Sequence, residues 1–216
     1  IVSQLEHHSN YVPWQQMCLR RGATFRVLPF DERGELDLAL FERMLNEKTR
    51  LVAVNQVSNS LGKVNPIKEI IRLAHAHEVP VLVDAAQAVQ HLAHDVRSLD
   101  ADFYVFSGHK MYGPMGIGVF YGKERWLEAL PPFLSGGEMI DTVTPEKVTF
   151  NVLPFKFEAG TPNVADAIGL GVAVDYLQQF DQLELQKYEE DLLAYGLNLL
   201  AEIPDLVVYG APAHRS

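Results

Sequence analysis

The chain has 216 residues, of which 48% are hydrophobic and 21% charged, a composition typical of folded globular proteins. Its 18 basic and 28 acidic side chains give a net charge of -10, which disfavours nucleic acid and anionic membrane surfaces as partners. No apolar stretch approaches the roughly 18 residues of a membrane span, so we expect no membrane protein. The single cysteine, Cys18, excludes a disulfide framework and favours a reducing, cytoplasmic compartment.

Apolar segments rich in β-branched residues alternate with amphipathic segments over about the first 130 residues. This alternation predicts an α/β domain with a mainly parallel sheet. Asn65 and Pro66 give the third helix a start signal, as helix cap and first helical residue. The predicted strands are Ile1–Leu5, Thr24–Leu28, Leu51–Val54, Val79–Val83, Phe103–Phe106 and Gly116–Tyr121, and the predicted helices are Asn10–Arg21, Asp37–Leu45 and Pro66–His77.

The second part of the chain follows a different pattern. Pro, Gly, Thr and aromatic residues dominate from Pro131 to Pro162, which indicates a surface excursion or a subunit contact. Two long helices, Val164–Phe180 and Leu183–Glu202, and a short strand, Leu206–Tyr209, are predicted after it. Because the sequence starts at Ile1 without a methionine and stops soon after a predicted strand, we expect a fragment.

Lys110 follows a predicted strand and lies in a glycine-rich segment, a place where α/β sheets bind ligands. A lysine there, next to hydroxyl and imidazole donors, can form a Schiff base with an aldehyde cofactor, although an isolated lysine is more often an ordinary surface residue. The glycines do not form a nucleotide-binding loop, because no Gly-Lys-Ser/Thr sequence closes them and a strand follows instead of a helix.

Asp84 ends another apolar strand, where a buried carboxylate needs a cationic partner. A helix cap or an ordinary ion pair would explain Asp84 by itself. Asp84 and Lys110 together, after two nearby strands, match what pyridoxal phosphate (PLP) requires: an acid for its ring nitrogen and a lysine for its aldehyde. The pair therefore indicates a PLP site.

His7 and Asn59 are weaker candidates for the same crevice. His7 comes just after the first predicted strand, and one imidazole is enough to stack on an aromatic cofactor. A histidine in an ordinary polar loop would give the same sequence pattern. Asn59 follows the third predicted strand and either reaches the crevice or only forms a turn.

Histidine pairs do not indicate a metal in this sequence. His7 and His8 are adjacent and point to different sides, so they do not bind one metal together. Histidine pairs at helical spacing lie on solvated helix faces more often than they bind a metal. We therefore interpret His75 with His77, and His91 with His94, as surface pairs. We expect no metal site.

Five motifs, in order and at compatible spacings, resemble those of SufS/CsdA-type (group II) cysteine desulfurases, which are class V aminotransferase-like PLP enzymes of fold type I. The resemblance covers essentially the whole chain. It implies the large domain of that fold, a mainly parallel mixed sheet flanked by helices. The motifs are EHHSN at 6–10, VSN at 57–59, VDAAQ at 83–87, SGHKMYGP at 107–114 and FEAGTPN at 157–163.

The resemblance implies roles for the residues that hold the cofactor ring. Lys110 would be the Schiff-base lysine and would move the proton at the substrate α-carbon. Asp84 would pair with the pyridinium nitrogen, Gln87 would hydrogen-bond the phenolic oxygen, and His7 would stack on the ring.

The remaining implied roles concern phosphate, substrate and the second subunit. Ser107 and His109 would hold the phosphate, and Asn59 would lie near the substrate. Thr161 matches a threonine that reaches the phosphate of the neighbouring subunit's cofactor, which implies a homodimer.

The chain departs from the family pattern at Ala85, where relatives commonly have glycine, and at Gln56, where some have histidine. The family's upstream Gly-Thr-Thr phosphate segment, its carboxylate-binding arginines and its persulfide-forming cysteine lie outside these residues. We expect residues 1–180 to be the central portion of the large domain and residues 181–216 to lead into a small C-terminal domain that is missing. The fragment itself is expected to be inactive.

The implied reaction converts L-cysteine to L-alanine and leaves sulfur as an enzyme persulfide for iron-sulfur cluster assembly. The implied partners are L-cysteine or L-selenocysteine and a sulfur-acceptor protein of a SufE-like or scaffold type. The alternatives are a selenocysteine lyase or another class V PLP enzyme and, from a different class, a non-catalytic dimerisation domain.

Cys18 is not expected to carry the sulfur. Trp14, Met17 and Cys18 share one face of a predicted helix, which predicts that the thiol packs in the core. A sulfur carrier needs an exposed and mobile thiolate.

Overall fold

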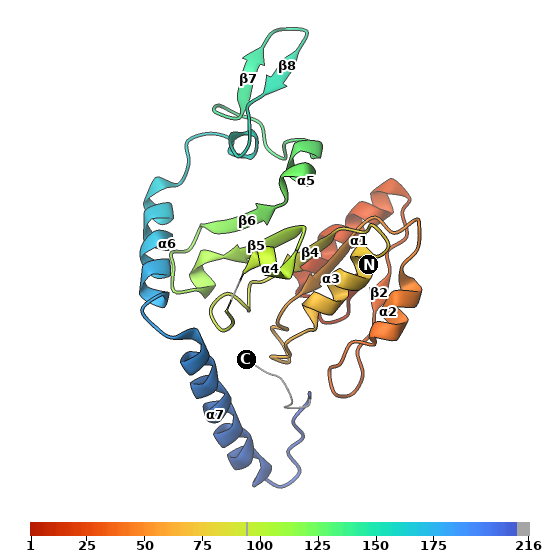
Figure 1. Ribbon diagram of the computed structural model, residues 1–216, viewed down its shortest axis with the longest axis vertical. Coiled ribbons are helices and arrows are strands. Elements are labelled where there is room, and N and C mark those ends of the chain that lie inside the picture. The colour runs from red at the N-terminus through yellow and green to blue at the C-terminus, as the bar shows by residue number, and fades with distance from the viewer. Residues whose placement is uncertain (94, 211–216) are drawn as a thin grey trace.

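A central sheet of six strands, in the order β2-β1-β3-β4-β5-β6, organises the computed structural model, which describes residues 1–93 and 95–210 (Figure 1). Neighbouring strands from β2 to β5 pair in parallel, and β6 pairs antiparallel with β5. The predicted mainly parallel mixed sheet is therefore confirmed. The strands are β1 (Val2–Ser3), β2 (Val27–Leu28), β3 (Val52–Asn55), β4 (Val81–Asp84), β5 (Phe103–Ser107) and β6 (Gly118–Gly122).

Helices flank this sheet, and their buried faces build its core. In α3 the residues Ile67, Ile70, Ile71 and Ala74 recur at helical spacing and are at most 3% exposed. The predicted cap at Asn65 is wrong, because Pro66 is the cap residue and the Asn65 amide donates to Asn55. The helices are α1 (His8–Arg21), α2 (Leu38–Met44), α3 (Ile67–His75), α4 (Val96–Leu99), α5 (Glu124–Ala129), α6 (Val164–Leu177) and α7 (Gln182–Ala201).

The two central strands, β3 and β4, are apolar up to their last residues, Asn55 and Asp84. Val52, Val54, Val81 and Val83 are at most 1% exposed, as expected for parallel strands covered on both faces. Burial of each such side chain contributes about 1.5–3 kcal/mol to folding. These strands therefore give a rigid base to the polar residues at their ends.

In the second half of the chain, the predicted surface excursion contains a pair of strands, and one predicted strand is absent from the described residues. The Pro131 to Pro162 segment contains a hairpin, β7 (Ile140–Val143) and β8 (Val148–Phe150), which projects away from the sheet (Figure 1). The predicted strand Leu206–Tyr209 is wrong: its four side chains are 44–76% exposed, and it pairs with no strand among the described residues. β-propensity alone does not form a strand without a neighbouring edge.

The last helix has little contact with the rest of the described chain. It extends away from the sheet in Figure 1, and none of its residues is buried. None of the helices in residues 1–93 and 95–210 combines the length and the apolar character that crossing a bilayer requires.

Candidate active site

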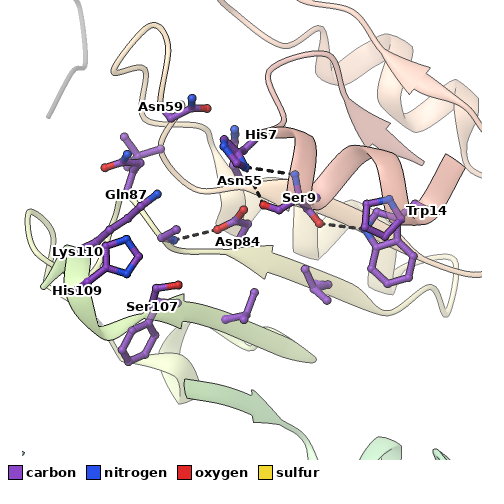
Figure 2. Close-up of a pocket in the computed structure, with 17 residues that line it drawn as sticks. His7, Ser9, Trp14, Asn55, Asn59, Asp84, Gln87, Ser107, His109 and Lys110 are labelled. Atoms are coloured by element: carbon purple, nitrogen blue, oxygen red, sulfur yellow. Dashed lines mark hydrogen bonds between the residues drawn. The ribbon is translucent and has the colours of Figure 1, made fainter. Parts of the chain in front are cut away.

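A pocket of about 580 Å³ lies where the parallel strands β1, β3, β4 and β5 end (Figure 2). Ligands of open α/β sheets bind outside the carboxyl ends of the strands. All the predicted site residues except Thr161 line this pocket: His7, Asn59, Asp84, Gln87, Ser107, His109 and Lys110. Thr161 is exposed on the segment that leads into α6.

Asp84 is fixed at the last position of β4. Its backbone is paired with Asn55 of β3 and Val105 of β5, and its Oδ1 accepts the Ala86 N–H at 3.0 Å. The half-buried carboxylate is thus oriented at the pocket by a sheet on both sides and by the turn that follows. Such an arrangement suits a cationic ring nitrogen.

Lys110 ends a single helical turn, Gly108–Lys110, directly after β5. Gly108 N–H donates to the Ile117 carbonyl at 2.8 Å, and Gly113 N–H donates to the Gly108 carbonyl at 2.9 Å. A side chain at Gly113 would place its Cβ 2.9 Å from the Gly108 oxygen, so this close approach requires glycine. The tight turn holds the half-buried Lys110 beside Ser107 and His109.

His7 and Gln87 each have one polar atom committed to the protein. His7 caps α1, and its Nδ1 accepts the Ser9 N–H at 3.2 Å, so Nε2 is the ring nitrogen left to face other groups. Gln87 Oε1 accepts from Gln90 Nε2 at 3.2 Å, so the Gln87 amide nitrogen is the donor left for the pocket. Figure 2 shows both side chains at the space that Lys110 and Asp84 border.

A buried hydrogen-bond network under the pocket was not among the predicted site features. Glu6 accepts from Ser3 Oγ at 2.5 Å, from the Asn55 N–H at 3.0 Å and from Asn10 Nδ2 at 2.6 Å. Asn10 Oδ1 in turn accepts from Trp14 Nε1 at 3.0 Å, and Asn10, Trp14 and Asn55 all line the pocket. The helical spacing of Asn10 and Trp14 is the sequence signal that could have placed them on one face.

Burial raises the pKa of Glu6 from 4.5 to about 7, against the hydrogen bonds that favour its charged form. The negative charge of Asp84 adds to this rise. Between these pH values the folded protein therefore binds a proton that the unfolded chain has released.

We expect the wild-type protein to lose stability relative to Glu6→Gln as the pH rises from about 5 to about 8. The loss amounts to about 3 kcal/mol, because the folded pKa lies above the unfolded one and the native carboxylate must ionise while buried. The measurement is the free energy of unfolding in urea at both pH values. Glu69→Gln, at an exposed carboxyl, is the control and should keep the wild-type slope; equal slopes in wild type and Glu6→Gln would contradict the assignment.

Cys18 does not pack in the core as predicted. Its side chain is half-buried, and Met17 beside it is 43% exposed. The reason is that α1 fully buries only Asn10, so its apolar face is incompletely covered by the described residues. Cys18 does not line the pocket.

The histidine pairs considered for a metal have other contacts. His75 Nε2 lies 2.7 Å from Asp102 Oδ2, and His91 Nδ1 lies 3.0 Å from Glu189 Oε1. His94 falls outside the described residues. No group of three or more metal-ligating side chains occurs in the part of the chain that the structure describes.

Comparison with known proteins gives consistent matches along the whole chain. The family model "Aminotransferase class-V" matches residues 1–216. A cysteine desulfurase of Dickeya dadantii is 54% identical over 216 residues, which are all of this chain and 52% of that protein. The chain thus spans about half the length of this relative.

Solved structures match the fold as well. The cysteine desulfurase CsdA of Escherichia coli superposes with a TM-score of 0.91 at 40% identity, covering 94% of this chain and 51% of that one. A C-DES mutant with glycine covalently linked to its PLP cofactor superposes with a TM-score of 0.81 at 28% identity, covering 92% of this chain and 55% of that one.

These matches confirm the fold class predicted from the motifs, the large-domain sheet of PLP enzymes of fold type I. The chain belongs to the aminotransferase class-V family, and its similarity within that family is to cysteine desulfurases.

Proposed function

We propose that the pocket binds PLP and that the full-length protein is a cysteine desulfurase, which converts L-cysteine to L-alanine and keeps the sulfur as an enzyme persulfide for iron-sulfur cluster assembly. The observation that carries this proposal is the meeting of Lys110 and Asp84 in one strand-end pocket. The similarity to cysteine desulfurases over the entire chain supports the choice of reaction.

The residues present fit PLP chemically. Asp84 offers a carboxylate to the pyridinium nitrogen, and Gln87 offers an amide donor to the phenolic oxygen. Ser107 and His109 offer a hydroxyl and an imidazole to the phosphate. The exposed face of His7 offers a ring for stacking.

Bound PLP would supply an electron sink for negative charge at the substrate α-carbon. Lys110 holds the aldehyde end and moves the proton at that carbon, as a half-buried amine at a fixed turn. Asp84 keeps the proton on the ring nitrogen. Asn59, on the loop after β3, contacts the substrate side of the pocket.

Assembly and partners form the less direct part of the proposal. Thr161 reaches the phosphate of a second copy in a homodimer, which is consistent with its exposure and its position outside this chain's own pocket. A sulfur acceptor of the SufE-like or scaffold type takes the persulfide sulfur in the cytoplasm. Residues 1–180 form the central part of the large domain, and residues 181–216 lead toward a small C-terminal domain.

The test of the function is turnover by the full-length protein loaded with PLP. In a single turnover without a sulfur acceptor, L-cysteine should yield L-alanine and protein-bound persulfide in equal amounts. L-selenocysteine and L-kynurenine, assayed in parallel, separate the desulfurase from other class V activities. Alanine release from either of these but not from L-cysteine would reject the proposal.

Cys18→Ala is expected to retain at least about half of the desulfurase turnover of the full-length protein. Cys18 lies in the last turn of α1 and outside the pocket, so its thiol cannot move between cofactor and acceptor. The measurement is alanine formation together with persulfide labelling. Loss of persulfide with PLP still bound would show that Cys18 is the carrier after all.

A further inference from the structure

Lys63 is a buried lysine that the proposed chemistry does not use. Its side chain is only 3% exposed, and its ammonium pairs with the carboxylate of Glu35, which is 45% exposed. Lysine is almost never buried without a partner, because removing its charge from water is costly. The pair joins two loops that are 28 residues apart in the sequence.

Lys63 closes the loop that carries Asn59. Ser58 N–H donates to the Lys63 carbonyl at 2.9 Å, and Gly62 N–H donates to the Ser58 carbonyl at 2.9 Å. Ser58 Oγ also accepts the Leu61 N–H at 3.3 Å. Asn59 lies at the exposed tip of this compact loop, beside the pocket (Figure 2).

Glu35 lies on a turn with its own fixed geometry. Asp31 Oδ1 accepts the backbone N–H groups of Arg33 and Glu35 at 2.9 and 2.8 Å. The two loops touch at a second point, since a Cβ on Gly34 would lie 3.0 Å from Leu61 Cδ1. The 31–35 turn therefore offers a firm surface against which the Asn59 loop can be held.

We propose that the Glu35–Lys63 ion pair fixes the 58–63 loop against the 31–35 turn and thereby positions Asn59 for the substrate. Glu35 and Lys63 are positioning residues that act through Asn59. This inference rests on the proposed function for the identity of the substrate, L-cysteine, but the loop contact itself does not.

Because Lys63 is buried and Glu35 is half-exposed, removing Glu35 should disturb the loop more than removing Lys63 does. Glu35→Gln leaves the ammonium buried without its counter-charge, so the loop must open to hydrate it. Lys63→Met keeps the volume and removes the charge, and the half-exposed Glu35 then remains in water. The double variant should therefore hold the loop better than Glu35→Gln alone.

The first experiment measures hydrogen exchange at the Leu61 and Gly62 amides in the full-length protein without added substrate. Glu35→Gln should accelerate exchange by at least about tenfold, and adding Lys63→Met should restore most of the protection. Glu69→Gln breaks the exposed pair with Arg72 and should leave both amides unchanged. Equal exchange in wild type and Glu35→Gln would overturn the proposal.

The second experiment asks whether the effect passes through Asn59. Glu35→Gln should raise the KM for L-cysteine by at least about threefold with kcat within about twofold. The same change in an Asn59→Ala background should add almost nothing, because the group that it positions is gone. Additive effects, or a parallel loss of kcat and bound PLP, would reject the positioning role. If the variants give the expected exchange result but the wild-type protein does not turn over L-cysteine, the proposed function and the substrate role of Asn59 are refuted, while the loop contact stands.

Discussion

Lys110→Ala is expected to lower L-cysteine turnover by at least about 10⁴-fold, because it removes both the amine that anchors the cofactor and the group that moves the α-proton. The protein should also lose the visible absorption of lysine-bound PLP. Initial rates of alanine formation and an absorption spectrum measure the two effects. The structure explains why no neighbour can substitute: Lys110 is the lysine among the residues that line the described pocket.

Lys68→Ala is the matched control for this loss. Lys68 is exposed on α3 and does not line the pocket, so the variant should keep the wild-type rate and spectrum. A Lys110→Ala protein that still catalysed the reaction within about tenfold of wild type would remove Lys110 from the chemistry.

Asp84→Asn is expected to reduce kcat/KM by about 10²–10³-fold while the protein remains folded. Asparagine has the same shape and can still accept from the Ala86 N–H, but it lacks the charge that holds a proton on the ring nitrogen. Steady-state kinetics and thermal unfolding of the PLP-loaded protein separate lost chemistry from lost stability.

Asp141→Asn controls for removal of a carboxylate elsewhere. Asp141 lies on the projecting β7–β8 hairpin and contacts Thr149, so its loss should leave the rate nearly unchanged. Unchanged kinetics in Asp84→Asn would instead assign Asp84 a purely structural role at the end of β4.

The sequence predicts the strands and their terminal polar residues well because both follow from local pattern. A buried parallel strand must be apolar, and the residues at its end or in the turn after it lie at the ligand edge of the sheet, where Asp84 and Lys110 line one pocket. The sequence pattern does not identify Asn55 as a site residue. The predicted third strand ends at Val54, and only the register, with Asn55 opposite Asp84, brings the asparagine into the site.

The errors share a physical origin, since each depends on a contact that the sequence pattern does not contain. Asn65 is a good helix cap by type, but its amide instead satisfies Asn55. The Leu206–Tyr209 segment has strand-forming residues but belongs to neither sheet of the described chain. The contacts of Glu6 with Asn55 and of Lys63 with Glu35 likewise join residues distant in sequence.

Borohydride reduction of the PLP-loaded, full-length protein tests the central claim most directly. Reduction makes the link between the cofactor and its lysine permanent, and proteolysis with mass spectrometry then locates it. The account predicts one modified peptide, which contains Lys110. Modification at Lys63, at any other lysine, or at none with PLP still bound would contradict it.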